Sequence, residues 1–179
     1  METTVIKNTQ YTKQTFKPLI SNDSLRPALN GVYIDTLNRC MVATDGHKLV
    51  KFPFNGEGNI SNVVEIDTFP VKKTNFNCIT ISETSAIRET PERSIKLNTI
   101  SEKYPAYQSV EPKGDPVPID SIKIDLKLFH ELYQSLKTVT GKNAHIELTF
   151  TGKESAIKFK TYTTEPEDTI SGLIMPVRQ

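Results

Sequence analysis

The chain has 179 residues, enough for one well-buried domain or two small ones. Its 22 Lys and Arg residues are balanced by 21 Asp and Glu residues, so overall charge predicts neither nucleic acid, nor a membrane surface, nor an acidic substrate as a partner. The N-terminus lacks the apolar core of a signal peptide, and no stretch approaches the roughly 18 to 20 apolar residues of a membrane span. We therefore expect a cytoplasmic protein with no membrane partner.

The first third of the chain predicts a short helix followed by a hairpin. A helix beginning near Thr15 would turn Phe16 and Leu19 inward and would end before Pro27. The runs GVYID and RCMVATDG follow, rich in β-branched and apolar residues, and the interruption at TLN between them suits a hairpin turn.

The middle of the chain predicts strands without a helix. The connection NGEGNISN, residues 55–62, is the expected boundary between modules. Beyond it, the runs VVEID, FNCITIS, SAIRE and SIKLNTI are short and closely spaced, a pattern typical of antiparallel strands. The next segment, EKYPAYQSVEPKGDPVP, holds four of the 11 prolines and must be extended or looped.

The strongest helical pattern is DLKLFHELYQSLKTV, in which Leu128, Leu132 and Leu136 recur at intervals of four. Asp125 is the expected N-cap and Gly141 the expected end. The alternating runs AHIELTFTG and SAIKFKTY predict a hairpin, and GLIMPV a last strand. Both ends of the chain thus run helix, then hairpin, a hint of internal repetition.

The whole pattern predicts an α+β fold of antiparallel sheets with helices on one side. We expect a single domain, residues 1–179, with three modules. Their expected bounds are 1–55, 62–112 and 117–179, and the middle module is all strand.

The motif TDGH could be catalytic or structural. Asp45 and His47 could form an acid/base pair or part of a metal site, but His130 and His145 lack a ligand spacing such as HExxH. The competing interpretation is a turn after the strand CMVA, with Gly46 at a positive φ. No nucleotide-binding or nucleophile motif is present, so we expect no catalytic residue, no metal and no cofactor.

The two cysteines predict no zinc or redox site. Cys40 and Cys78 lie far apart in apolar alternating stretches, and no CxxC is present. A reduced thiol in such a place behaves as a small hydrophobic group.

Lysines gather around both expected helices. Lys13 and Lys17 belong to the first, and Lys127, Lys137 and Lys142 to the second. Most such faces are simply solvated, but both helices could instead turn their lysines toward a DNA phosphate backbone and bind it without reading sequence. Composition alone leaves both interpretations open.

Three separated motifs, taken in their order along the chain, indicate a family resemblance: RPALNG with VATDGHKL, then YPAYQSV, then IMPVR. Together they resemble the bacterial sliding clamp, the beta subunit of DNA polymerase III. The resemblance covers residues 12–54, 76–112 and 122–179, so the chain is similar to a shortened clamp of about half a protomer. It implies a DNA-clamp-like fold, lysine-bearing helices that face DNA, and a processivity factor rather than an enzyme.

The resemblance also implies a pocket for short apolar peptide segments, assembled from the three motifs. Its expected residues are Leu29, Thr44, Gly46, His47, Lys48, Leu49, Pro105, Val110, Leu173, Met175, Pro176, Val177 and Arg178. Lys48 stands where the family usually has arginine.

The implied partners are DNA polymerase and other replication or repair proteins, which bind through short linear motifs. Double-stranded DNA and further copies of this chain are partners if a ring forms. The alternative is a peptide-binding adaptor or decoy that binds clamp partners without forming a ring.

Overall fold

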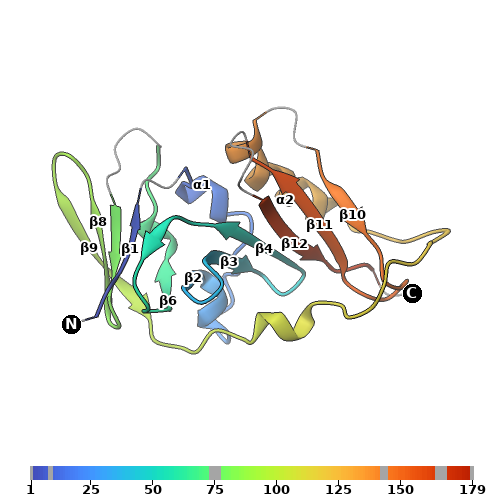
Figure 1. Ribbon diagram of the computed structural model, residues 1–179, viewed down its shortest axis with the longest axis horizontal. Helices are drawn as coiled ribbons and strands as arrows, with labels where there is room; N and C mark the ends of the chain where they lie inside the picture. Colours follow the sequence, from blue (N-terminus) through green and yellow to red (C-terminus); the bar gives the residue numbers. More distant parts are fainter. Residues whose placement is uncertain (1, 8–9, 73–77, 142–144, 164–168, 178–179) are drawn as a thin grey trace.

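The computed structural model describes residues 2–7, 10–72, 78–141, 145–163 and 169–177. Its strands join into one antiparallel sheet of twelve, in the order β10-β11-β12-β4-β3-β2-β6-β9-β8-β7-β1-β5 (Figure 1). The strands are β1 Thr4–Lys7, β2 Gly31–Asp35, β3 Cys40–Thr44, β4 Lys48–Pro53, β5 Gly56–Glu57, β6 Asn62–Glu65, β7 Cys78–Ile81, β8 Ser85–Glu89, β9 Ser94–Ile100, β10 Glu147–Thr149, β11 Ile157–Tyr162 and β12 Thr169–Ile174. The helices are α1 Lys13–Phe16 and α2 Leu126–Thr140, with 3-10 turns η1 Pro27–Asn30, η2 Ile66–Thr68 and η3 Tyr107–Val110.

Three antiparallel meanders make up most of the sheet: β2-β3-β4, β7-β8-β9 and β10-β11-β12. The first follows α1 and the third follows α2. Between β6 and the second meander, the described residues form only the turn η2. The repetition of helix and hairpin predicted for the two ends is therefore confirmed, and the middle meander has no matching helix in the described residues.

Helix α2 forms for the reasons read from its sequence. The Asp125 carboxylate accepts the N–H of Lys127 at 2.8 Å, which satisfies one of the unpaired donors of the first turn. Gly141, with φ 78°, ends the helix in a conformation that a side chain would disfavour. Leu132, Leu136 and Val139 are buried against the sheet.

The two helices lie side by side on one face of the sheet (Figure 1). The Ser135 hydroxyl donates to the Thr15 carbonyl at 2.6 Å, and the hydroxyls of Thr15 and Thr138 are 2.7 Å apart. We call the side of the sheet that the two helices cover the helix face. Its core includes the rings of Phe16, Phe52 and Phe69, which are fully buried. The predicted α+β arrangement, with two helices on one side, is confirmed.

The opposite face of the sheet is covered by the proline-rich segment 101–118, which we call the linker. The Tyr104 ring stacks on Tyr33 with 4.8 Å between centroids. The Tyr107 hydroxyl donates to the Asp35 carboxylate at 2.8 Å. These contacts fix the linker over what we call the linker face, although only η3 in it is regular.

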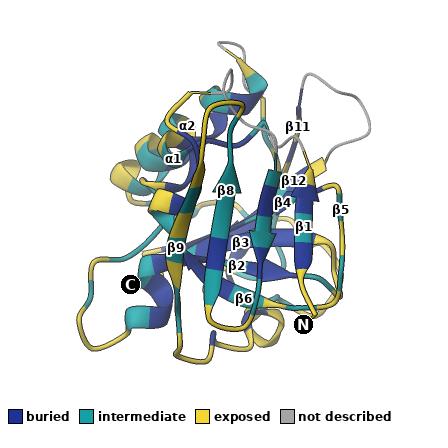
Figure 2. Ribbon diagram, turned by 90° about the vertical axis from the view of Figure 1, so that its left-hand side faces the viewer, coloured by how far each residue is buried: buried dark blue, intermediate teal, exposed yellow. Residues whose placement is uncertain are grey.

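Several boundaries differ from those expected. β1 was not predicted; it pairs with β7 and with the two-residue strand β5, which lies inside the expected connection 55–62. The last strand begins at Thr169 and ends at Ile174, earlier than the run GLIMPV indicates. Figure 2 shows the end of the sheet that carries β1, β8 and β9, and β9 mostly alternates exposed and half-buried residues there. No helix in the described part of the chain is long and apolar enough to cross a membrane.

Candidate functional site

An apolar cavity of about 430 Å³ opens on the linker face. Its walls come from the turn between β3 and β4, from the linker around η3, and from the end of β12. Ten of the residues expected in a pocket line it: Leu29, Thr44, Gly46, His47, Lys48, Leu49, Pro105, Val110, Leu173 and Met175. Segments far apart in sequence thus meet around one hollow.

Of the three remaining expected residues, Pro176 and Val177 do not line the cavity. Pro176 is buried. Val177 is exposed, and its N–H donates to the Lys123 carbonyl at 2.9 Å. Arg178 lies outside the described residues.

Six further residues line the cavity and were not among those expected: Arg26, Tyr104, Ala106, Tyr107, Ser109 and Ala156. Four of them, Tyr104, Ala106, Tyr107 and Ser109, belong to the motif YPAYQSV, which the resemblance had already linked to the pocket through Pro105 and Val110. Ala156 gave no signal, because it precedes β11 in a run that reads as an ordinary strand.

The turn Thr44–Lys48, which we call the rim turn, is shaped by its own side chains. One Asp45 oxygen accepts the N–H groups of His47 at 2.9 Å and Lys48 at 3.0 Å. Gly46 has φ 94°, and the Thr44 hydroxyl donates to the Lys48 carbonyl at 2.6 Å. The turn interpretation of TDGH is therefore confirmed.

Asp45 is committed to this turn and to an ion pair. Burial would raise the pKa of its carboxyl, but the Lys48 ammonium and the two backbone donors outweigh burial and hold the pKa below its ordinary value. Its contact with His47 is to the backbone, so the geometry gives no acid/base pair. Among the described residues, no three His, Cys, Asp or Glu side chains are placed to hold a metal ion.

Lys48 lines the cavity but does not offer its ammonium to it. Its side chain is 1% exposed, and the ammonium lies 2.5 Å from both Asp45 Oδ2 and Glu131 Oε2. Because side chains alternate along β4, Lys48 shares the helix face with buried Val50, while Leu49 faces the cavity. Lys48 therefore ties the rim turn to α2. Glu131 was missed because it lies 83 residues away in sequence.

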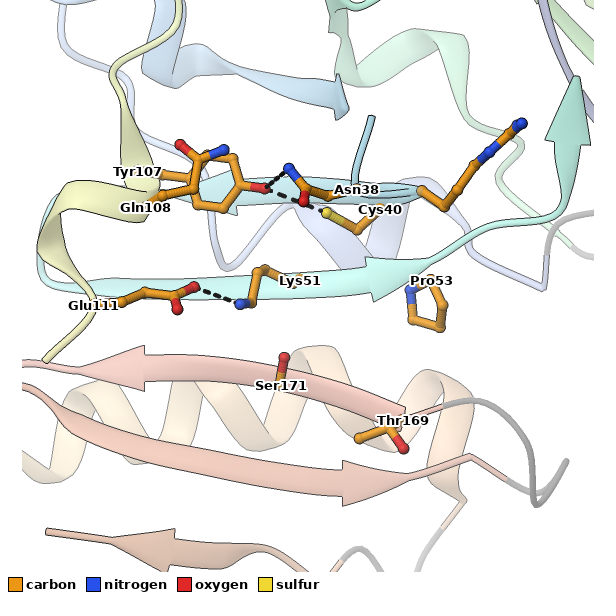
Figure 3. Close-up of a pocket in the computed structure, with 10 residues that line it drawn as sticks. Asn38, Cys40, Lys51, Pro53, Tyr107, Gln108, Glu111, Thr169 and Ser171 are labelled. Carbon is orange, nitrogen blue, oxygen red and sulfur yellow. Dashed lines mark hydrogen bonds and ion pairs between the residues drawn. The ribbon is translucent and has the colours of Figure 1, made fainter. Parts of the chain in front are cut away.

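A second, polar cavity of about 380 Å³ lies next to the first, and Tyr107 lines both (Figure 3). Lys51 and Glu111 form an ion pair in it, with 2.5 Å between Nζ and Oε1. Cys40 also lines it, with its sulfur 3.5 Å from the Tyr107 hydroxyl. Burial raises the pKa of the Cys40 thiol, so it stays protonated and is a poor nucleophile.

Of the lysines expected to face DNA, those that the structure describes lie in the helices or directly after one, and several already have partners. Lys13 pairs with Asp67. Lys127 Nζ is 3.9 Å from Glu131 Oε1, and Lys137 Nζ lies 5.5 Å from the Tyr133 ring centroid. Lys17 directly follows α1 and is exposed, and Lys142 lies outside the described residues.

Comparison with solved structures gives close matches in fold. The beta clamp of Helicobacter pylori in complex with diflunisal has a TM-score of 0.70 and 15% identity, over 99% of this chain and 67% of that chain. The DNA polymerase III beta chain of Streptococcus pneumoniae has a TM-score of 0.71 and 12% identity, and the beta subunit of Thermotoga maritima 0.70 and 14%.

This chain has the sliding-clamp fold. The expected DNA-clamp-like architecture is confirmed at a level of identity where sequence comparison gives nothing: no protein-family model and no curated protein matches. The alignments cover 99 to 100% of this chain but only 65 to 67% of the clamp chains named here, so the chain spans about two thirds of their length.

Proposed function

We propose that this chain is a sliding-clamp-like processivity factor that binds short apolar segments of DNA polymerase and other replication or repair proteins. The observation that carries the proposal is the apolar cavity on the linker face, which is lined by residues of three separated sequence motifs. The clamp fold supports it. The protein would act by tethering, and we expect no catalytic activity from it.

The cavity has the properties that such binding needs. Leu29, Leu49 and Leu173 supply apolar wall, and Met175 adds an adaptable side chain. Burying two apolar side chains of a partner contributes about 1.5 to 3 kcal/mol each. With a few backbone hydrogen bonds this gives affinity in the micromolar range, which lets partners exchange.

Calorimetry with a peptide of the pattern Gln-Leu-x-Leu-Phe tests the proposal. Wild type should bind it, and the double variant Leu29→Ala with Met175→Ala should bind at least about tenfold more weakly, because two apolar contacts are lost. Leu126→Ala is the matched control, since Leu126 is 81% exposed on α2 and should leave affinity unchanged. Absence of binding to wild type, or equal affinity of the double variant, contradicts the proposal.

Contact with DNA is the second part of the proposal. Lys13, Lys17, Lys127, Lys137 and Lys142 would face the phosphate backbone from the helix side. Such contact is non-specific and weakens as salt is added. The ion pairs of Lys13 and Lys127 lower the charge available, so this attraction is weak in a single chain and becomes useful only where several copies surround DNA.

The alternative function is a peptide-binding adaptor or decoy that does not form a ring. One observation favours it: the middle meander has no matching helix in the described residues. Light scattering discriminates the two. A stable oligomer supports the processivity factor, whereas a monomer at high concentration supports the adaptor.

A further inference from the structure

We propose that the polar cavity is a second binding subsite, which takes an acidic side chain from the flank of the same peptide that fills the apolar cavity. This inference rests on the proposed function. It identifies the chemistry of the partner segment beyond its apolar anchors, and it concerns the residues drawn in Figure 3.

The strand register places the two cavities one after the other along the same pair of strands, β4 and β12. Leu173 of β12 pairs with Leu49 of β4, and both line the apolar cavity. One step along the same face, Ser171 pairs with Lys51, and both line the polar cavity. A step of two residues in a strand is about 7 Å, so an extended peptide anchored between the two leucines brings a residue two positions further on to Lys51.

The charges in the polar cavity select for a carboxylate. Lys51 and Arg39 are the cations that line it, and Glu111 is the anion. The Arg39 guanidinium donates one N–H to the Gly56 carbonyl at 2.5 Å and stays charged, so two cations face one anion, and Lys51 is the cation on the strand that also carries Leu49. Ser171 and Thr169 add hydroxyl groups to the same wall (Figure 3).

Glu111 acts as an internal stand-in for that ligand. It directly follows η3, whose last residue, Val110, lines the apolar cavity, and it holds Lys51 from the linker side. The two side chains are 27% and 37% exposed, and an ion pair this accessible contributes little to stability. A peptide carboxylate can therefore replace Glu111 on Lys51 at small cost.

Peptides with constant Leu and Phe anchors and a variable flank test the inference by calorimetry. The flank residue, two positions beyond the anchors and placed at each end in turn, is Glu, Gln or Lys. In wild type at low salt, the Glu peptide should bind about threefold more tightly than the Gln peptide from one end, the size expected of an exposed charge pair. The Lys peptide should bind most weakly.

Two variants assign the effect to named groups. Lys51→Met should remove the preference for Glu over Gln, and Glu111→Gln should increase it, because the competing carboxylate is gone. Lys153→Met and Glu83→Gln change net charge equally at exposed positions away from both cavities, and should leave the preference at its wild-type value.

The outcomes separate this inference from the function on which it rests. Equal binding of all flanks from both ends, or a preference unchanged in Lys51→Met, overturns the polar subsite and leaves the apolar cavity as the peptide site. If no peptide of the series binds at all, the proposed function fails first. A preference that is lost in Lys51→Met and enlarged in Glu111→Gln supports the inference.

Discussion

The two faces of strand β4 are covered by different kinds of structure. Val50 and Phe52 point to the helix face, where α1 and α2 close over a core of aromatic and aliphatic side chains. Leu49 and Lys51 point to the linker face, where the cover is an irregular segment with one short 3-10 turn. Regular helices fill the space above a sheet, whereas a proline-rich segment bridges it and leaves hollows. The cavities follow from the kind of cover rather than from the sheet.

The largest expected effect separates the two faces by stability. Phe52→Ala removes a fully buried ring that lies 5.1 Å from the Tyr11 ring and 5.2 Å from the Phe16 ring, centroid to centroid. It should cost about 3 to 5 kcal/mol of unfolding free energy. Where the variant is still folded, peptide affinity should be unchanged, since Phe52 faces away from the cavity. Denaturant titration and calorimetry on one sample measure both, and a large loss of affinity would contradict the separation of the faces.

The next effect concerns the tie across the sheet. Lys48→Met leaves the carboxylates of Asp45 and Glu131 close together without their cation, so we expect a loss of about 3 kcal/mol. Peptide affinity should fall as well, because the rim turn loses its anchor on α2.

Lys48→Arg is the matched variant, since a guanidinium can bridge both carboxylates, and it should restore most of the stability and affinity. If Lys48→Met kept full peptide affinity, the ion pairs would be a feature of the helix face alone.

The smallest effect is a dependence on pH. The pKa of Asp45 is lowered in the folded protein, so its ionised form adds stability above the unfolded pKa of about 3.9, and this contribution is lost as pH falls through the folded value. Asp45→Asn should therefore be less stable than wild type at pH 7, and the difference should narrow below about pH 4. Denaturation midpoints across that range measure it, and a constant difference would show that the depressed pKa does not contribute.

Sequence patterns predicted the local structure well where one periodicity dominated. Alternation identified the hairpins β2-β3 and β10-β11, and the spacing of Leu128, Leu132 and Leu136 identified α2. Strand β1 was missed because its short run TVIK stands in an otherwise polar N-terminal stretch, and its pairing with β7 bridges more than 70 residues.

The candidate site was predicted in position but not in detail. Three ordered motifs identified ten of the residues that line the cavity. The direction of the Lys48 side chain, however, depends on Glu131, which no local pattern connects to it. The polar cavity depends on Lys51 and Glu111 meeting across the linker, which is again a product of the tertiary fold.

The most direct test of the account is an NMR titration of methyl-labelled protein with the Leu- and Phe-bearing peptide. The account predicts that the methyl signals of Leu49, Leu173 and Met175 shift on binding, while those of Leu132 and Leu136 on the helix face stay in place. Shifts confined to the helix face, or no shifts at saturating peptide, would contradict the central claim that the apolar cavity is the binding site.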